Sequence, residues 1–171
     1  MDKDALRALQ APIKERYREK PDVAVITLKA QGSIDETAIA CKVETGRALA
    51  VAGLHPATGG SGLELCSGDM LLEALVACAG VTLKAVATAL DIRLRSGIVR
   101  AEGDLDFRGT LGVDKEAAVG FKSIRLAFDL DTDAPDEAVA QLIKLTERYC
   151  VVYQTLNKRP DLSVTVNRSA S

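Results

Sequence analysis

The pattern of apolar and polar positions is strongest in the middle of the chain, where it predicts a long helix. Apolar residues occupy almost all sides of residues 70–90. Ser67 is a natural N-cap, and Asp69 favours the positive end of the helix dipole. A helix that is apolar all round is predicted to be buried. Glu73 and Lys84 leave ten uncharged residues between them, whereas a membrane span needs about twenty. We therefore predict a buried helix and no membrane span.

Alternating apolar positions predict strands on both sides of this helix. A first hairpin is expected to turn at residues 31–33, and a second one within residues 109–120. Between the first hairpin and the helix, residues 53–67 read as a loop that contains Gly, Ser and Pro. Loops of this length are uncommon in compact domains and are often functional. The predicted strands cover residues 23–27, 34–43, 99–107, 124–130 and 162–166.

Two further helices are predicted nearer the ends of the chain. Residues 12–19 form the first, which ends before Pro21. The second follows Asp133 and has Pro135 in its first turn. The order is then helix, two strands, long helix, two strands, helix and strand, which differs from a βαβα alternation and predicts an α+β fold. The apolar stripe of the second helix comprises Val139, Leu142, Ile143, Thr146, Tyr149, Cys150 and Tyr153.

Length and composition place the chain among globular proteins. Its 171 residues fit a single domain, residues 1–171, with residues 1–20 as an N-terminal helical extension. A hydrophobic content of 47% with a net charge of -2 excludes intrinsic disorder. Lys and Arg do not outnumber Asp and Glu, so no nucleic-acid partner is expected. The first ten residues carry charges and lack an apolar core, so we predict no secretory signal and a cytoplasmic location.

Four cysteines are the unusual feature of the composition. In a reducing compartment, paired cysteines indicate redox or metal chemistry more than a structural disulfide. Cys41 alternates with apolar residues on a predicted strand and is expected to be a small buried side chain. Cys66 lies at the end of the loop. It could serve as an exposed auxiliary thiol or be a packed loop residue, and the sequence leaves both roles open. Cys78 and Cys150 lie on apolar helix faces that packing could bring together, so a core role and a redox couple are both open for them.

A reactive cysteine has to be a thiolate, and a free thiol has a pKa near about 8.5. Cys78 lies ten residues beyond Gly68, which is about 15 Å along a helix. The helix dipole acts within the first turn, so it cannot lower the pKa of this thiol. A cation from another segment is therefore expected, and the candidates are Arg18, Arg47 and Arg148.

Other chemistries have weaker support in the sequence. The chain has no C-x₂-C pair and a single His, so a zinc site would have to combine His55 with Cys66, Cys78 and Cys150. His55 stands next to Pro56 and is expected to be a solvent-facing loop residue rather than the base of a Cys-His hydrolase. The segment TGGSG at residues 58–62 lacks the Lys-Ser/Thr of a P-loop.

Four segments of the chain carry a specific combination of motifs. They are SGDMLLEALVACAGV (residues 67–81), AEGDLDFRG (101–109), FKSIRLAFDLDTDAPDE (121–137) and ERYCVVYQTL (147–156). The combination is an apolar helix with L-x-x-C, followed by a second Cys on a later helix after an acidic-basic turn. In these segments the chain resembles the OsmC/Ohr family of thiol-dependent organic hydroperoxide reductases, and the likeness extends over about residues 20–167.

The resemblance implies an α+β domain with antiparallel sheets around a long buried central helix. It also implies an intertwined homodimer with active sites at the interface. The thiol of Cys78 would reduce an organic hydroperoxide and become a sulfenic acid, and Cys150 would condense with it to a disulfide. A lipoyl or thioredoxin-like dithiol would then reduce the disulfide. No metal or organic cofactor is implied, and the biological role would be protection against oxidative stress.

The chain departs from the family pattern at three positions. Gly68 stands where the family usually has a carboxylate, and Asp69 is one place away. Val151 stands where a Pro often follows the second Cys, and Arg47 is the best match for the activating Arg. These differences keep an alternative function open, in which an OsmC-like dimer holds a small lipophilic ligand without peroxidase activity.

Overall fold

The structure of the protein is a computed structural model that describes residues 2–5, 8, 11, 19, 31–34, 40–44, 49–112 and 114–168. For residues 31–34, 40–44, 49 and 108 it describes the backbone alone. Of the predicted helix 12–19, Glu19 is described and is helical. The rest of that helix and the predicted strand 23–27 lie outside the described residues.

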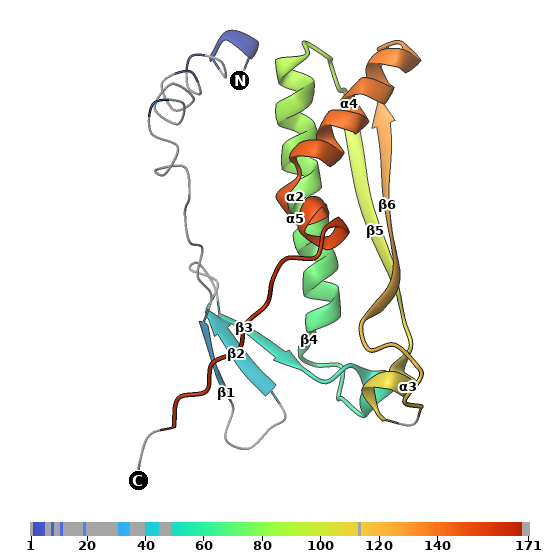
Figure 1. Cartoon of the computed structure of the whole chain (residues 1–171). Helices are drawn as coiled ribbons and strands as arrows, with labels where there is room; N and C mark the ends of the chain where they lie inside the picture. Colours follow the sequence, from blue (N-terminus) through green and yellow to red (C-terminus); the bar gives the residue numbers. More distant parts are fainter. Residues whose placement is uncertain are drawn as a thin grey trace.

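The described elements form two sheets and a group of helices (Figure 1). A four-stranded sheet has the order β1-β2-β3-β4, and a long antiparallel hairpin pairs β5 with β6. The helices α2, α4 and α5 lie beside this hairpin, which gives the mixed α+β class that the sequence predicts. In chain order the elements are β1 (Gln31–Ile34), β2 (Ala40–Glu44), β3 (Leu49–Gly53), η2 (Pro56–Thr58), β4 (Leu65–Cys66), α2 (Ser67–Ala89), β5 (Ser96–Leu105), α3 (Phe107–Thr110), β6 (Phe121–Asp131), α4 (Asp136–Tyr149) and α5 (Val151–Asn157).

The first sheet corrects the predicted N-terminal hairpin. Residues 31–33 are predicted as a turn but belong to β1, which pairs antiparallel with β2 so that Ile34 faces Cys41. The predicted strand 34–43 is therefore divided between β1 and β2. The sequence pattern also missed β3, which runs antiparallel to β2. Its sequence, LAVAG, is apolar at every position and gives no period-2 signal.

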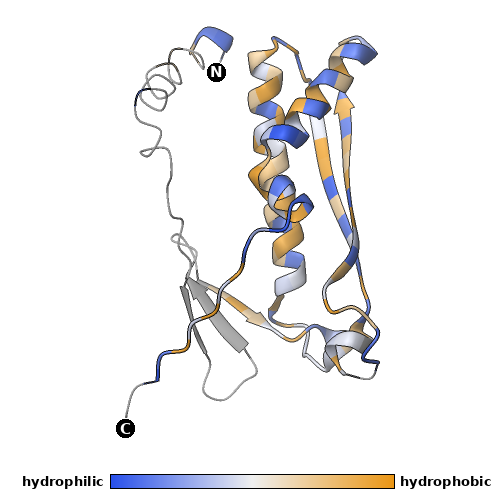
Figure 2. Cartoon of the chain, viewed as in Figure 1, coloured by the Kyte–Doolittle hydropathy of each residue, from blue (hydrophilic) through white to orange (hydrophobic). Residues whose placement is uncertain are grey.

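The hairpin of β5 and β6 confirms the second predicted strand pair. The less exposed positions of both strands alternate with exposed ones, as the sequence pattern predicts. Figure 2 shows this alternation of apolar and polar residues along β6. The inward side chains of β6 include Ile124, Leu126 and Phe128, which pack against the buried residues of α2 and α4. Phe107 is the exception to the predicted pattern, because it begins the short helix α3.

Helix α2 forms where the sequence predicts it, but a single chain covers only one of its faces. The helix begins at Ser67 with Cys66 at the N-cap position, so the prediction of Ser67 as N-cap is wrong by one residue. Apolar residues occur along its whole length (Figure 2), yet the opposite face, with Val81 73% exposed, is open. The buried residues recur every fourth position on the face that contacts β5 and α4, and they are Leu75, Ala79, Leu83 and Ala87.

By length and composition, α2 is also apolar enough to cross a membrane. Its mean hydropathy reaches 1.8 over 18 residues, of which 28% are buried within the chain. A core helix of a soluble protein passes the same test, and α2 packs against β5, α4 and α5 as a core helix does. The absence of a membrane span stays a prediction that rests on the charges of Glu73 and Lys84.

The second predicted helix is divided at Cys150. Residues 136–149 form α4, and residues 151–157 form α5. Cys150 between them has an extended backbone, with φ -71° and ψ 109°, so the apolar stripe continues while the helix does not. The predicted last strand is also wrong, because residues 158–168 form no regular element. Its alternating side chains Leu162, Val164 and Val166 are highly exposed in the single chain.

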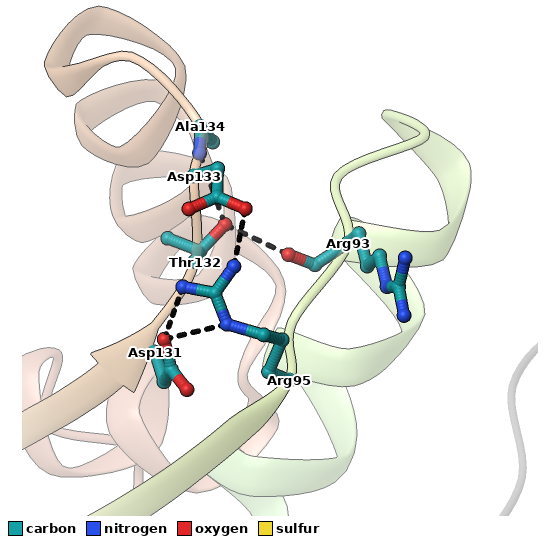
Figure 3. A network of polar contacts seen from close by, with 6 residues as sticks. All are labelled: Arg93, Arg95, Asp131, Thr132, Asp133 and Ala134. Carbon is teal, nitrogen blue, oxygen red and sulfur yellow. Dashed lines mark hydrogen bonds and ion pairs between the residues drawn. The ribbon is translucent and has the colours of Figure 1, made fainter.

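A polar network fixes the start of β5 to the connection between β6 and α4 (Figure 3). The Arg95 guanidinium pairs with Asp131 at 2.5 Å and also with Asp133. Thr132 donates its hydroxyl to the Arg93 carbonyl at 2.7 Å and accepts a hydrogen bond from the Ala134 amide. This network holds the chain that leaves α2 against the chain that enters α4.

Candidate active site

The fold brings Cys78 and Cys150 together, although 72 positions separate them in the sequence. Cys150 is completely buried and forms one core cluster with Leu75 and Ala79 of α2, and Cys78 packs against this cluster. The two thiols are near enough that each acts on the pKa of the other. Cys78 itself is half-buried, so one thiol of the pair is accessible and the other is enclosed.

The surroundings of Cys78 favour its thiolate. Burial raises the pKa of the Cys78 thiol, but several hydrogen bonds outweigh it and hold the pKa below its ordinary value. They come from the backbone of Val152, the thiol of Cys150, the backbone of Val151 and the side chain of Thr82. The break at Cys150 is what places these two backbone groups at the start of α5 near the sulfur. Cys78 is thus the more acidic thiol of the pair.

Cys150 has the opposite character. Burial is the largest influence and raises the pKa of the Cys150 thiol, and the neighbouring Cys78 raises it further. The backbone amide of Tyr153 donates a hydrogen bond to the Cys150 sulfur at 3.5 Å, which makes this side chain the cap of α5. At neutral pH the pair therefore consists of a thiolate-favouring Cys78 and a protonated Cys150, which can supply the second thiol of a disulfide.

The charged residues predicted for the site do not reach Cys78 within the described chain. Arg18 and Arg47 lie outside the described residues. Arg148 lies at the end of α4, where its guanidinium stacks over the Tyr149 ring at 5.6 Å from the centroid. Asp69 is exposed in the first turn of α2, nine residues and about 14 Å along the helix from Cys78. Among the described residues, neither of these two is one of the main groups acting on the pKa of Cys78.

A pocket of about 440 Å³ lies between α2, β6, α4 and α5, and its lining residues include neither Cys78 nor Cys150. Leu75 and Tyr153, which pack around Cys150, also line this pocket. Its remaining walls include Leu126 and Phe128 of β6, and Glu147 brings a carboxylate to it. Lys122, Ser123 and Asn157 also line the pocket, so its walls are both apolar and polar. The apolar part of such a pocket suits the hydrocarbon part of a small molecule.

Comparison with known proteins identifies the family of this fold. The family model described as OsmC-like protein matches residues 60–165, which is more than half of the chain and includes both Cys78 and Cys150. The chain belongs to the OsmC-like family. The resemblance in the sequence is thereby confirmed at the level of the family. No match was found among proteins with curated functions.

Solved structures of OsmC-like proteins share this fold at low sequence identity. An OsmC-like protein from Mycoplasma pneumoniae aligns with a TM-score of 0.64 at 16% identity, over 78% of this chain and 89% of that one. An organic hydroperoxide resistance protein from Elizabethkingia anophelis gives 0.63 at 14% identity, over 79% and 91%. Another, from Legionella pneumophila, gives 0.60 at 16% identity, over 77% and 90%. At these identities the comparisons establish the fold alone.

The other candidate residues of this OsmC-like chain lie apart from the pair of Cys78 and Cys150. Cys66 is half-buried at the N-cap of α2, and its thiol makes no capping hydrogen bond. His55 caps η2, because its Nδ1 accepts a hydrogen bond from the Ala57 amide at 3.0 Å, and its ring stacks on Phe107. Cys41 lies in β2, and its side chain is outside the description. Within the described residues, no group of three His, Cys, Asp or Glu side chains could hold a metal ion.

Sequence reasoning missed the polar groups that act on Cys78. It searched for a cation, whereas the described structure presents the side chain of Thr82 and two backbone groups. Thr82 was detectable, because it lies four residues after Cys78 and hence on the same helix face. The backbone groups of Val151 and Val152 were not detectable, because their positions depend on the break between α4 and α5 at Cys150. The sequence pattern does not indicate this break.

Because the pKa of Cys78 is lowered and that of Cys150 is raised, the two thiols should ionise over different pH ranges. Iodoacetamide alkylation, followed for each cysteine by peptide mass spectrometry between about pH 5 and about pH 10, reports the thiolate fraction. Because hydrogen bonds stabilise the Cys78 thiolate, its rate should reach a plateau at lower pH than that of a cysteine in an unstructured peptide. Cys150 should reach its plateau at higher pH and react more slowly. An inflection for Cys78 at or above that of the peptide would contradict the geometry described above.

Proposed function

We propose that this OsmC-like protein is a thiol-dependent peroxidase that reduces organic hydroperoxides. The observation that carries the proposal is the proximity of two thiols in opposite settings, because the pKa of the accessible Cys78 is lowered and that of the buried Cys150 is raised. Membership of the OsmC-like family supports it, as does the naming of two structural neighbours as organic hydroperoxide resistance proteins. The proposed role is protection against oxidative stress in the cytoplasm.

The proposed reaction uses only the two thiols and external substrates. The Cys78 thiolate attacks the terminal oxygen of the hydroperoxide, the O–O bond breaks, and an alcohol leaves after its oxygen takes up a proton. Cys78 is then a sulfenic acid. The Cys150 sulfur attacks the Cys78 sulfur, a disulfide forms, and the hydroxyl leaves as water with the proton of the Cys150 thiol. A dithiol reductant, lipoyl or thioredoxin-like, returns both cysteines to thiols by exchange.

The apolar side chains that line part of the pocket favour an organic substrate over hydrogen peroxide. Burying the alkyl or aryl group of a hydroperoxide contributes about 25 cal/mol per Å² of apolar area, and hydrogen peroxide has no such area. Leu75 and Tyr153 connect the pocket to the surroundings of Cys150. The substrate class proposed here is therefore alkyl, aryl or lipid hydroperoxides.

We further propose that the functional unit is a homodimer. The open face of α2 carries apolar side chains such as Val81, and large exposed apolar areas mark interfaces. The alternating apolar residues of the tail, Leu162, Val164 and Val166, are likewise uncovered in one chain. A second copy that covers α2 would also bring further residues, among them candidates for the activating Arg and carboxylate, close to Cys78.

One equivalent of cumene hydroperoxide tests the function directly. Mass spectrometry of the product under non-reducing conditions should show a peptide pair linked by a Cys78–Cys150 disulfide, with cumyl alcohol formed in equal amount. Cys66→Ser serves as the control and should give the same disulfide, because Cys66 lies at the far end of α2. An unchanged dithiol would contradict the peroxidase and favour the alternative, in which the dimer holds a lipophilic molecule in the pocket.

A further inference from the structure

The α4–α5 corner, where the backbone leaves the helix at Cys150, is spanned by the side chain of Gln154. The Cys150 amide donates to the Thr146 carbonyl at 2.9 Å, and the Gln154 amide donates to the Cys150 carbonyl at 2.9 Å. In an uninterrupted helix the next carbonyl, that of Glu147, would accept a bond from the backbone amide four residues later. Here it accepts one from the side-chain amide of Gln154 at 2.8 Å. Gln154 is therefore bonded to the last turn of α4 as well as to Cys150.

The α4–α5 corner determines how the Cys150 thiol is presented to α2. The change of direction between the two helices takes place in the backbone torsions of Cys150, φ -71° and ψ 109°. On either side of it, α4 and α5 both contact α2. Val152 and Tyr153 of α5 pack against the core cluster that contains Cys150, and Cys78 packs against the same cluster from α2. A bond that fixes the angle between α4 and α5 therefore also fixes the direction of the Cys150 side chain.

The Cys150 sulfur provides a second bond at this corner, but the proposed reaction changes it. The sulfur accepts a hydrogen bond from the Tyr153 amide at 3.5 Å, and sulfur is a weak acceptor. Cys78 and Cys150 are free thiols in the structure, so forming a disulfide moves their sulfurs into bonding distance. The cap at Tyr153 then loses its present geometry. The bond from Gln154 to the Glu147 carbonyl contains no sulfur and does not depend on the oxidation state of either cysteine.

We propose that Gln154 is a positioning residue for the disulfide step. Its side chain holds α5 against the end of α4 while the Cys150 sulfur leaves the Tyr153 amide and bonds to Cys78. Gln154 acts through Cys150, because it keeps a high effective concentration of the Cys150 thiol at Cys78. The consequence for hydroperoxide reduction rests on the proposed function. The ease with which the two cysteines form a disulfide does not, because any disulfide reagent can oxidise them.

Three variants of the full chain test this role without hydroperoxide. Gln154→Met removes the donor at similar length. Gln154→Lys keeps an N–H donor that can reach the end of α4, and Thr155→Val removes an α5 hydroxyl that is bonded to the Val151 carbonyl. In a buffer of reduced and oxidised dithiothreitol, two electrons and two protons pass from the cysteine pair to the reagent. Alkylation of the remaining thiols and mass spectrometry then give the fraction of Cys78–Cys150 disulfide.

The variants should differ in the stability of the disulfide. Gln154→Met should lower its equilibrium constant by about three- to tenfold, which is the effect of one hydrogen bond. Gln154→Lys should stay within about twofold of the wild type, because a lysine near the end of a helix also donates to its carbonyls. Thr155→Val should stay within about twofold as well. With cumene hydroperoxide, Gln154→Met should slow disulfide formation by the same factor and slow the preceding oxidation of Cys78 by less than about twofold.

Three results would overturn the proposal. Gln154→Met with the wild-type equilibrium constant would show that the side chain does not position Cys150. Gln154→Lys as low as Gln154→Met would show that the donor is not what matters. Thr155→Val as low as Gln154→Met would indicate a general loosening of α5. If hydroperoxide leaves the wild-type Cys78 unchanged, the peroxidase function fails, whereas the measurements in the dithiothreitol buffer still decide the role of Gln154.

Discussion

Replacing Cys78 with serine is expected to lower the rate of cumene hydroperoxide reduction by at least about a thousandfold, because it removes the proposed nucleophile. A serine hydroxyl is not ionised at neutral pH and cannot use the hydrogen bonds that favour the thiolate of Cys78. The measurement is hydroperoxide consumption with dihydrolipoamide as the reductant. Far-ultraviolet circular dichroism should be unchanged, since the substitution replaces a half-buried thiol by a group of similar size.

Replacing Cys150 with serine should have a different kinetic signature. The first turnover should remain, because Cys78 still reacts with the hydroperoxide, but the disulfide cannot form. Cys78 should then accumulate as a sulfenic acid that dimedone traps, and should proceed to the sulfinic acid with excess hydroperoxide. Cys66→Ser is the matched control and should retain full turnover. Retention of activity in Cys78→Ser, or its loss in Cys66→Ser, would contradict the assignment of the nucleophile.

Replacing Val81 with aspartate is expected to dissociate the proposed homodimer. Val81 lies on the open face of α2 and is 73% exposed in a single chain. If a second copy covers this face, the new carboxylate is buried without a partner, which costs about 3–5 kcal/mol. The dimer dissociation constant should therefore rise by about 10²- to 4 × 10³-fold. Size-exclusion chromatography with multi-angle light scattering, over a range of protein concentrations, measures this change.

A control for this substitution is available in the same chain. Val119 is 74% exposed and lies in the connection between α3 and β6, not on α2. Val119→Asp should leave the molecular mass unchanged, because the new charge stays in water. A wild-type protein that is monomeric, or a Val81→Asp variant that dimerises as tightly as Val119→Asp, would show that a second copy does not cover this face of α2.

The sequence predicted the elements whose hydrophobic pattern is long and regular. The apolar segment around Cys78 gave α2, and the alternation of residues such as Ile124 and Leu126 gave the β5–β6 hairpin. Prediction from the sequence failed where the hydrophobic pattern is short or not periodic, and where the end of an element depends on contacts with other parts of the chain. The all-apolar β3 gave no periodic signal, and the apolar stripe through Cys150 concealed the end of α4. A stripe reports which side is apolar and not where the backbone leaves the helix.

The C-terminal tail is a second case in which the sequence pattern did not predict the structure. Leu162, Val164 and Val166 alternate as a strand does, yet residues 158–168 form no regular element in one chain. A strand needs backbone partners, because each of its N–H and C=O groups must be paired along the ladder. Alternation in the sequence shows that one face is apolar but provides no partner. The predicted strand at residues 162–166 is therefore wrong for the single chain, because alternation alone does not form a strand.

By itself the sequence determined the α+β class, the positions of the long apolar elements and the family resemblance. Through that resemblance it also singled out Cys78 and Cys150 among four cysteines. The tertiary structure decided that these two thiols meet, which one is accessible, and that hydrogen bonds oppose the effect of burial on Cys78. The physical reason is that periodicity reports the burial of one element at a time. The pKa of a thiol depends instead on every group that packing brings within hydrogen-bond distance, including backbone groups that any sequence would supply.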